Sequence, residues 1–77
     1  MGIEHKNARS MSPSQKQINT LLKCYEKGQI AQAEKLSLSM TQEFPQHEFG
    51  WKVLGVIYGM TGKYDKAVKV NQMAVLL

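Results

Sequence analysis

The chain lacks the residues and runs that several large classes of protein require. Its 77 residues include one cysteine, Cys24, so it forms neither an intrachain disulfide nor a zinc site built from several cysteines. It has two prolines, and aromatic residues make up 8% of it. Its longest apolar stretch, Val53–Met60, is interrupted by two glycines. That stretch is far shorter than the roughly 18–20 apolar residues of a membrane span.

Signals for catalysis, metal binding and secretion are also missing. There is no Gly-rich phosphate loop, no histidine pair at metal-ligand spacing and no serine beside an obvious base. His5 is isolated, and His47 is expected to cap a helix or face solvent. Met1–Met11 carries charge but no apolar h-region, so it does not resemble a secretory signal. We therefore expect no catalytic residue, no metal, no cofactor and a cytoplasmic, reducing setting.

Neither sign of charge forms a run. Ten Lys and Arg residues against six Asp and Glu residues give a net charge of +4, and the basic residues are scattered. Dispersed lysines are typical of a solvated helical surface. A basic excess also gives non-specific affinity for phosphate. A small basic nucleic-acid-associated helical module therefore stands as the alternative to a protein-binding function.

Four amphipathic segments occupy most of the chain. Apolar residues recur at i, i+3, i+4 and i+7, as in a helix, and no run alternates with the period of two that marks a strand. The pattern predicts helices from Ser12, over Ile30–Glu43, over Glu48–Met60 and from Tyr64 onward. Ser12 is expected to be the first N-cap, in a capping box with Gln15.

The third predicted helix carries two apolar stripes. They consist of Trp51, Leu54 and Tyr58, and of Val53, Ile57 and Met60. A helix that is apolar on more than one face is buried on more than one face. We expect this helix to lie between two neighbours, with Trp51 and Tyr58 filling the space between consecutive helix pairs.

The helical pattern occurs twice, in a register that aligns Gly28 with Gly62 and Ala33 with Ala67. This fixed spacing, which we call the repeat period, indicates a stack of helix-turn-helix units. The prediction is an all-α fold of four antiparallel helices in two repeats. Its expected parts are a flexible tail over 1–11 and a repeat domain over 12–77, made of repeat one (14–47) and a truncated repeat two (48–77).

These residues resemble the tetratricopeptide repeat, a helix-turn-helix unit whose period matches the one seen here. Repeat two matches the signature at Trp51, Leu54, Gly55, Tyr58, Gly62, Ala67 and Ala74. Repeat one matches at Gly28, Ala33 and Pro45, but its first helix has Gln17, Thr20, Leu21 and Cys24 at signature sites. The resemblance implies an α-solenoid fragment of about two repeats. The departures suit a first repeat, as in the N-terminal fragment of a bacterial-type protein of this family.

The resemblance also implies a concave groove, because first helices of successive repeats in this family line a peptide-binding surface. The implied lining consists of Ile18, Asn19, Leu22, Tyr25, Phe49, Lys52, Val53, Val56 and Met60. The clamp that reads chaperone C-termini needs Lys and Asn at positions held here by Ile18, Leu22 and Val53. We therefore expect an apolar ligand, either an amphipathic helix of a partner or a second copy of this chain.

The last predicted helix ends in Met73–Leu77, which contains no polar side chain. An apolar patch of this kind is expected to be covered, either by further repeats or by another copy. The residues assigned to self-association are Met73, Val75, Leu76 and Leu77, with a dimer favoured. The sequence thus predicts a non-enzymatic scaffold for protein–protein interaction.

Overall fold

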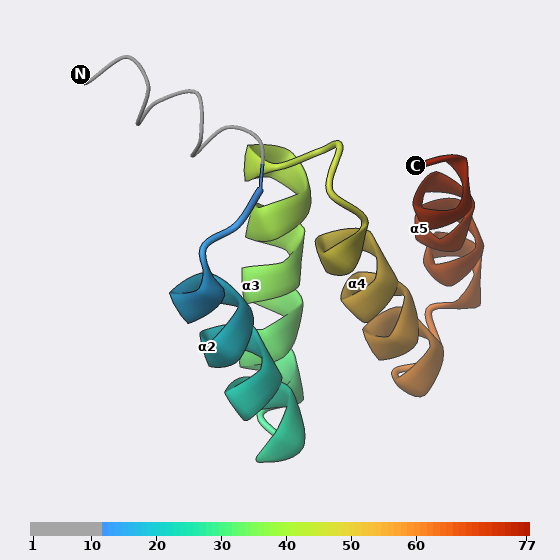
Figure 1. Cartoon of the computed structure of the whole chain (residues 1–77). Coiled ribbons are helices and arrows are strands. Elements are labelled where there is room, and N and C mark those ends of the chain that lie inside the picture. The colour runs from blue at the N-terminus through green and yellow to red at the C-terminus, as the bar shows by residue number, and fades with distance from the viewer. Residues whose placement is uncertain (1–11) are drawn as a thin grey trace.

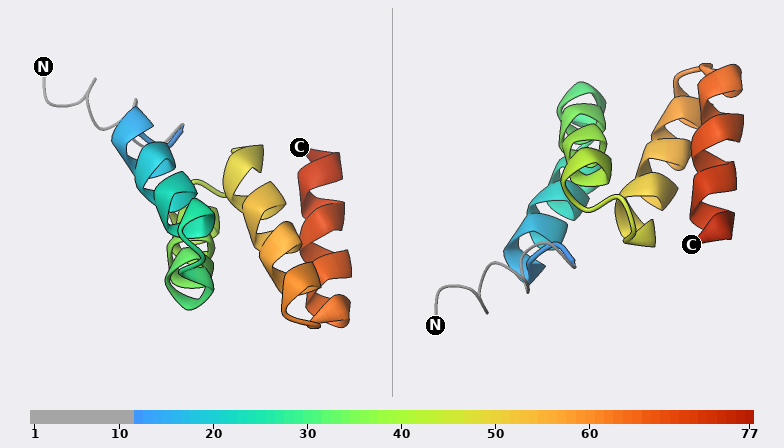
Figure 2. Two further views of the ribbon diagram at one scale, coloured as in Figure 1. Left: turned by 90° about the horizontal axis from the view of Figure 1, so that it is seen from below. Right: turned by 90° about the horizontal axis from the view of Figure 1, so that it is seen from above.

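The computed structural model describes residues 12–77, so the predicted flexible tail over 1–11 lies outside the described residues. Four α-helices follow one another, each antiparallel to the one before it and lying beside it (Figures 1 and 2). Their bounds are α2 (Gln15–Glu26), α3 (Ile30–Glu43), α4 (Glu48–Met60) and α5 (Tyr64–Leu76). Residues 12–77 contain no strand. The all-α prediction of two helix pairs is confirmed.

The first helix begins later than predicted, because Ser14 and not Ser12 is its N-cap. The Ser14 Oγ accepts a hydrogen bond from the Gln17 N–H at 3.1 Å, and the Ser14 N–H donates to Gln17 Oε1 at 2.8 Å. The sequence offers two Ser-x-x-Gln capping boxes, starting at Ser12 and at Ser14. The second leaves both serines and Pro13 outside the helix, where serine is more favourable than in a helical turn.

The two turns inside the helix pairs have the same backbone geometry, one repeat period apart. Gly28 and Gly62 both adopt a φ of 78°, a left-handed conformation that costs other residues roughly 1–2 kcal/mol. The N–H after each glycine donates to the carbonyl five residues earlier, at 2.9 Å in the first turn and 2.8 Å in the second. The period read from the sequence is therefore present in the backbone.

Buried side chains form two clusters, one on each side of α4. The cluster shared by α2, α3 and α4 contains Leu21, Ala33, Met40, Phe44 and Ile57. The cluster between α4 and α5 contains Leu54, Tyr58, Ala67 and Val70. Helix α4 thus lies between two neighbours, as its two apolar stripes predict. Met60 is the exception, since it is 57% exposed in the last turn of α4.

Trp51 packs within the second helix pair and not between pairs. It is half-buried against the α4–α5 cluster, and its indole N–H donates to the Pro45 carbonyl at 2.9 Å. Tyr58 belongs to the same cluster. The expectation that these aromatic residues fill the space between consecutive pairs is therefore wrong. Their stripe faces α5, and the space next to α3 is taken by the stripe that contains Ile57.

Glycines bring α4 close to both of its neighbours. A Cβ added at Gly50 would lie 3.1 Å from the Met40 Cβ on α3. A Cβ added at Gly55 would meet the Asn71 side chain on α5 and lie 3.4 Å from Val70 Cγ2. Larger residues at either position would push the helices apart, because these contacts are already as tight as van der Waals radii allow.

Candidate interaction surfaces

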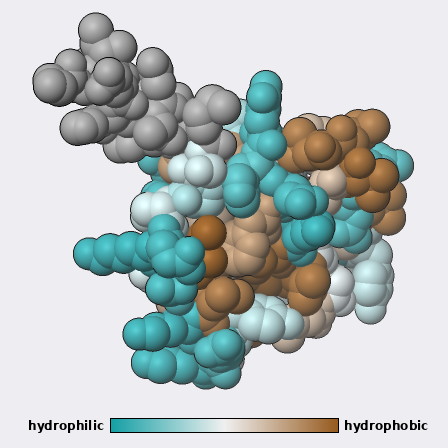
Figure 3. All heavy atoms as spheres, in the orientation of Figure 1, coloured by the Kyte–Doolittle hydropathy of each residue, from teal (hydrophilic) through white to brown (hydrophobic). Residues whose placement is uncertain are grey.

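A hollow of about 240 Å³ lies between α2 and α4, and we call it the α2–α4 hollow. Its lining consists of Leu22, Tyr25, Phe49, Lys52, Val53 and Val56. In Figure 3, hydrophobic atoms gather in the middle of the visible face, where α4 borders the first helix pair. Lys52 is the charged member of the lining, and its Nζ lies 3.2 Å from a carboxylate oxygen of Glu48.

The helix geometry explains why these side chains meet. Leu22 and Tyr25 lie three residues apart on α2, whereas Phe49, Val53 and Val56 follow the i, i+4, i+7 spacing on α4. Residues at these spacings share one helix face. The two faces meet above the cluster shared by α2, α3 and α4, against which the half-buried members pack.

Three of the nine predicted groove residues lie outside the lining of the α2–α4 hollow. Ile18 is half-buried, and Asn19 is exposed, with its Oδ1 accepting a hydrogen bond from Gln15 Nε2 at 3.1 Å. Met60 is exposed at the C-terminal end of α4. The structure brings the central six predicted residues together and places these three elsewhere.

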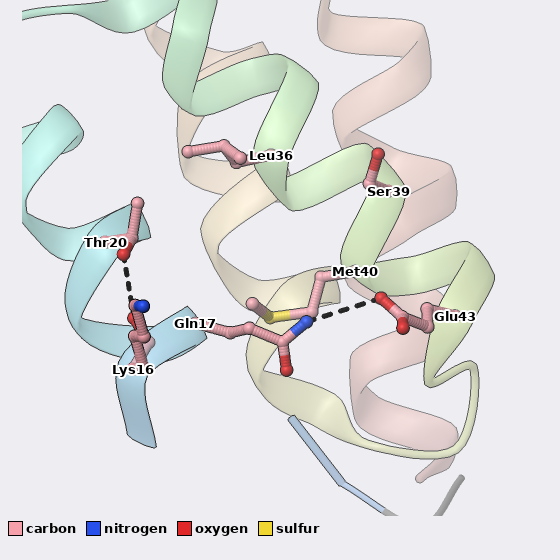
Figure 4. Close-up of a pocket in the computed structure, with 7 residues that line it drawn as sticks. All are labelled: Lys16, Gln17, Thr20, Leu36, Ser39, Met40 and Glu43. Carbon is pink, nitrogen blue, oxygen red and sulfur yellow. Dashed lines mark hydrogen bonds between the residues drawn. The ribbon is translucent and has the colours of Figure 1, made fainter. Parts of the chain in front are cut away.

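A second hollow, of about 210 Å³, lies between α2 and α3, and we call it the α2–α3 hollow (Figure 4). Its lining consists of Lys16, Gln17, Thr20, Leu36, Ser39, Met40 and Glu43. Gln17 Nε2 donates to Glu43 Oε1 at 3.4 Å and so joins the two helices (Figure 4). The sequence pattern did not predict this hollow. The available signal was Gln17 and Thr20 at positions where repeat two has Trp51 and Leu54.

The outer face of α5 carries the most exposed large apolar side chains. Val75 is 85% and Leu76 is 79% exposed. A third hollow on this face is lined by Val68, Asn71, Gln72, Val75 and Leu76. Met73 and Leu77, also assigned to self-association, are exposed but lie outside that lining. Figure 3 shows hydrophobic atoms over the C-terminal end of α5.

The single histidine and the single cysteine between residues 12 and 77 have local structural roles. The His47 Nδ1 accepts a hydrogen bond from the Phe49 N–H at 3.3 Å and so caps α4. Cys24 is half-buried against the cluster shared by α2, α3 and α4. Within the described residues, no group of three or more His, Cys, Asp or Glu side chains is placed to hold a metal. No helix in the same part of the chain has the length and apolar character needed to cross a bilayer.

A family model described as tetratricopeptide repeat matches residues 22–41, from the second half of α2 to near the end of α3. The match spans the Gly28 turn, whose geometry recurs one repeat period later at Gly62. This match, together with the recurring turn geometry, identifies a tetratricopeptide repeat over residues 22–41. Comparisons with curated proteins and with solved structures found no match. Tetratricopeptide repeats are generally non-catalytic modules for protein–protein interaction.

Proposed function

We propose that this tetratricopeptide repeat chain is a scaffold that binds an amphipathic helix of a partner protein in the α2–α4 hollow. The observation that carries the proposal is the open apolar lining contributed by two separate helices. Leu22 is 37% and Val56 is 49% exposed there. Covering these side chains removes apolar surface from water, which favours association by roughly 25 cal/mol per Å² before the costs of binding.

The shape and charge of the hollow favour a particular kind of helix. A helical ligand presents apolar anchors at i, i+3, i+4 and i+7, and such a stripe fits a groove between two helices. Lys52 at the edge of the hollow favours an acidic residue beside those anchors. The net charge of +4 acts in the same direction by attracting acidic partners. The proposed ligand is therefore an amphipathic helix with a partly acidic polar face.

The test is a titration of the full-length chain, labelled with ¹⁵N, by a designed helical peptide with four leucines at these spacings and a glutamate-rich polar face. Binding should shift the amide signals of Leu22, Val53 and Val56. The variant Val56→Asp should weaken binding by about tenfold or more, since it places a charge in the apolar contact. Val75→Asp on α5 is the matched control and should bind as the unmodified chain does.

Two results would contradict the proposal. One is an equal loss of affinity in the two valine variants, and the other is a set of shifts away from the α2–α4 hollow.

The salt dependence of binding distinguishes the proposed function from its alternative. Apolar peptide binding should persist at high salt, whereas binding to a phosphate polymer falls steeply with salt concentration. Salt-sensitive binding to nucleic acid, without peptide binding, would favour the basic nucleic-acid-associated module.

We also propose that α5 mediates self-association, with a second copy of the chain covering Met73, Val75, Leu76 and Leu77. A shift of one repeat period places Val75 on Thr41, which is 3% exposed on α3. Met40 and Thr41 lie against α4 near Gly50. Val75 lacks such a cover within the described residues.

The two ends of the helix stack differ in a way that favours a closed dimer. In a head-to-tail stack, α2 of one copy would pack on α5 of the next as α4 packs on α3. Lys16 would then stand where α4 has Gly50, and a lysine there prevents the close approach that the glycine permits. A two-fold contact of α5 with α5 avoids this conflict and closes the assembly.

Light scattering by the full-length chain at tens of micromolar tests the self-association. The expected mass is twice the 8.7 kDa of one chain. Val75→Asp should shift the chain toward monomer, whereas Val56→Asp should leave it dimeric. A mass near that of one chain for the unmodified protein, or a series of ever larger assemblies, would contradict a closed dimer.

A further inference from the structure

The α2–α3 hollow occupies the place at which the second helix pair packs Trp51, Leu54 and Val70 together. Shifted by one repeat period, its seven lining residues become Gly50, Trp51, Leu54, Val70, Met73, Ala74 and Leu77. None of these seven counterparts has a charged side chain, and the indole N–H of Trp51 is their one polar side-chain group. Trp51 packs there against the cluster that contains Leu54 and Val70. In the first pair, five of the seven lining residues are polar or charged.

A difference between the two repeats at one position explains why the space between α2 and α3 stays open. Leu21, which is fully buried, stands where repeat two has Gly55. The glycine lets α4 and α5 approach closely, and α2 and α3 make a looser contact. Gln17 and Thr20 are too small to fill the wider space between the helices. The hollow thus lies at the repeat position that Trp51 occupies in the second pair, and the first pair has no tryptophan there.

We propose that the α2–α3 hollow binds the indole side chain of a tryptophan in a partner peptide. The apolar part of its lining is Leu36 together with the buried Met40. A methionine sulfur makes favourable contacts with aromatic rings. Lys16 at the edge supplies a cation that is attracted to an indole face. Trp51, the one tryptophan of this chain, is already packed, so the indole comes from another molecule.

The indole N–H also has an acceptor at this site. In the second pair, the Pro45 carbonyl accepts the N–H of Trp51 at 2.9 Å. In the α2–α3 hollow, the Glu43 carboxylate fills that role, because it has two acceptor oxygens. Its bond from Gln17 is 3.4 Å long, beyond the usual range of roughly 2.7–3.2 Å, and so yields easily to a better donor.

The test uses N-acetyl-tryptophanamide as the probe, titrated into the full-length ¹⁵N-labelled chain. The expected result is saturable shifts at Lys16, Thr20 and Met40, with a dissociation constant on the order of 1 mM. N-acetyl-leucinamide should bind about tenfold more weakly, because it lacks the ring and its N–H. Equal binding of the two probes, or shifts that do not saturate, would overturn the proposal.

Filling the hollow should abolish the site without harming the fold. Thr20→Leu should weaken probe binding by about tenfold or more, and Ser39→Leu on the α3 side provides the same test independently. Val56→Ser is the matched control in the α2–α4 hollow and should leave the affinity for the probe unchanged. The proposal fails if a folded filling variant binds the probe normally, or if Val56→Ser alone reduces binding.

Discussion

The first helix pair has a leucine at the repeat position where the second has a glycine, and its two helices contact each other less extensively. Leu21 and Gly55 occupy the same position of the repeat. Leu21 is fully buried in the cluster shared by α2, α3 and α4, and Gly55 lets α4 meet Asn71 and Val70. The second pair therefore buries its large residues between its own helices, and the first buries them against α4.

This difference shows that one helix-turn-helix plan admits two modes of packing. The turns are alike, since Gly28 and Gly62 share a φ of 78°. The two pairs differ in the side chains that lie between their helices. A half-buried tryptophan sits in the second pair, and a hollow with a polar edge remains in the first.

The largest expected effect is the loss of the leucine that spaces the first pair. Leu21→Ala should lower the free energy of unfolding by about 3–5 kcal/mol, because it removes a fully buried side chain and leaves a cavity. In a domain of this size, such a loss approaches the whole stability. Urea denaturation followed by circular dichroism measures it. Leu22→Ala, at a 37% exposed neighbour, is the control and should cost far less; equal costs would refute the assigned core.

Trp51→Ala tests the second pair. The half-buried indole should contribute about 2–3 kcal/mol, below the roughly 3–5 kcal/mol of a fully buried aromatic. Gln17→Ala, its counterpart in repeat one, should cost about 1 kcal/mol through its lost capping box. Chemical denaturation of the two variants gives the comparison. Similar losses would mean that the two positions pack alike, against the contrast described above.

The two turn glycines should behave as a matched pair. Gly28→Ala and Gly62→Ala each force a left-handed conformation on alanine and should cost roughly 1–2 kcal/mol. No neighbour within 4 Å would clash with the new Cβ at either site, so the two costs should agree closely. Thermal unfolding of both variants checks this. A large difference would show that the turns are not equivalent.

The smallest expected effect is a gain in stability. Thr20→Leu places an apolar side chain in the α2–α3 hollow and adds a better helix former. The free energy of unfolding should rise by about 0.5–1 kcal/mol. Urea denaturation measures the change, with Thr20→Ala separating helix propensity from filling. A gain in the alanine variant equal to that in the leucine variant would mean that the hollow is not filled.

Much of the secondary structure follows from short-range patterns. The bounds of α3 and α4 agree with those predicted from the apolar spacing, and both turn glycines end their helices as expected. The predicted start of α2 was wrong, because Ser12 and Ser14 each begin a Ser-x-x-Gln capping box and the local sequence does not distinguish them. The sequence did not predict a packing role for Gly50. Only a small residue fits there because α3, a separate helix, packs against it.

The sequence by itself determined the helices and the two buried faces of α4, because these depend on residues within one or two turns of each other. It also determined the repeat period, because the same pattern of residues occurs twice along the chain. Only the tertiary structure decided that Trp51 faces α5, that six of the nine groove residues meet and that a hollow remains beside Gln17. Each of these outcomes depends on how closely two helices approach. That distance is set by side chains from both helices together, and the pattern along a single helix does not contain it.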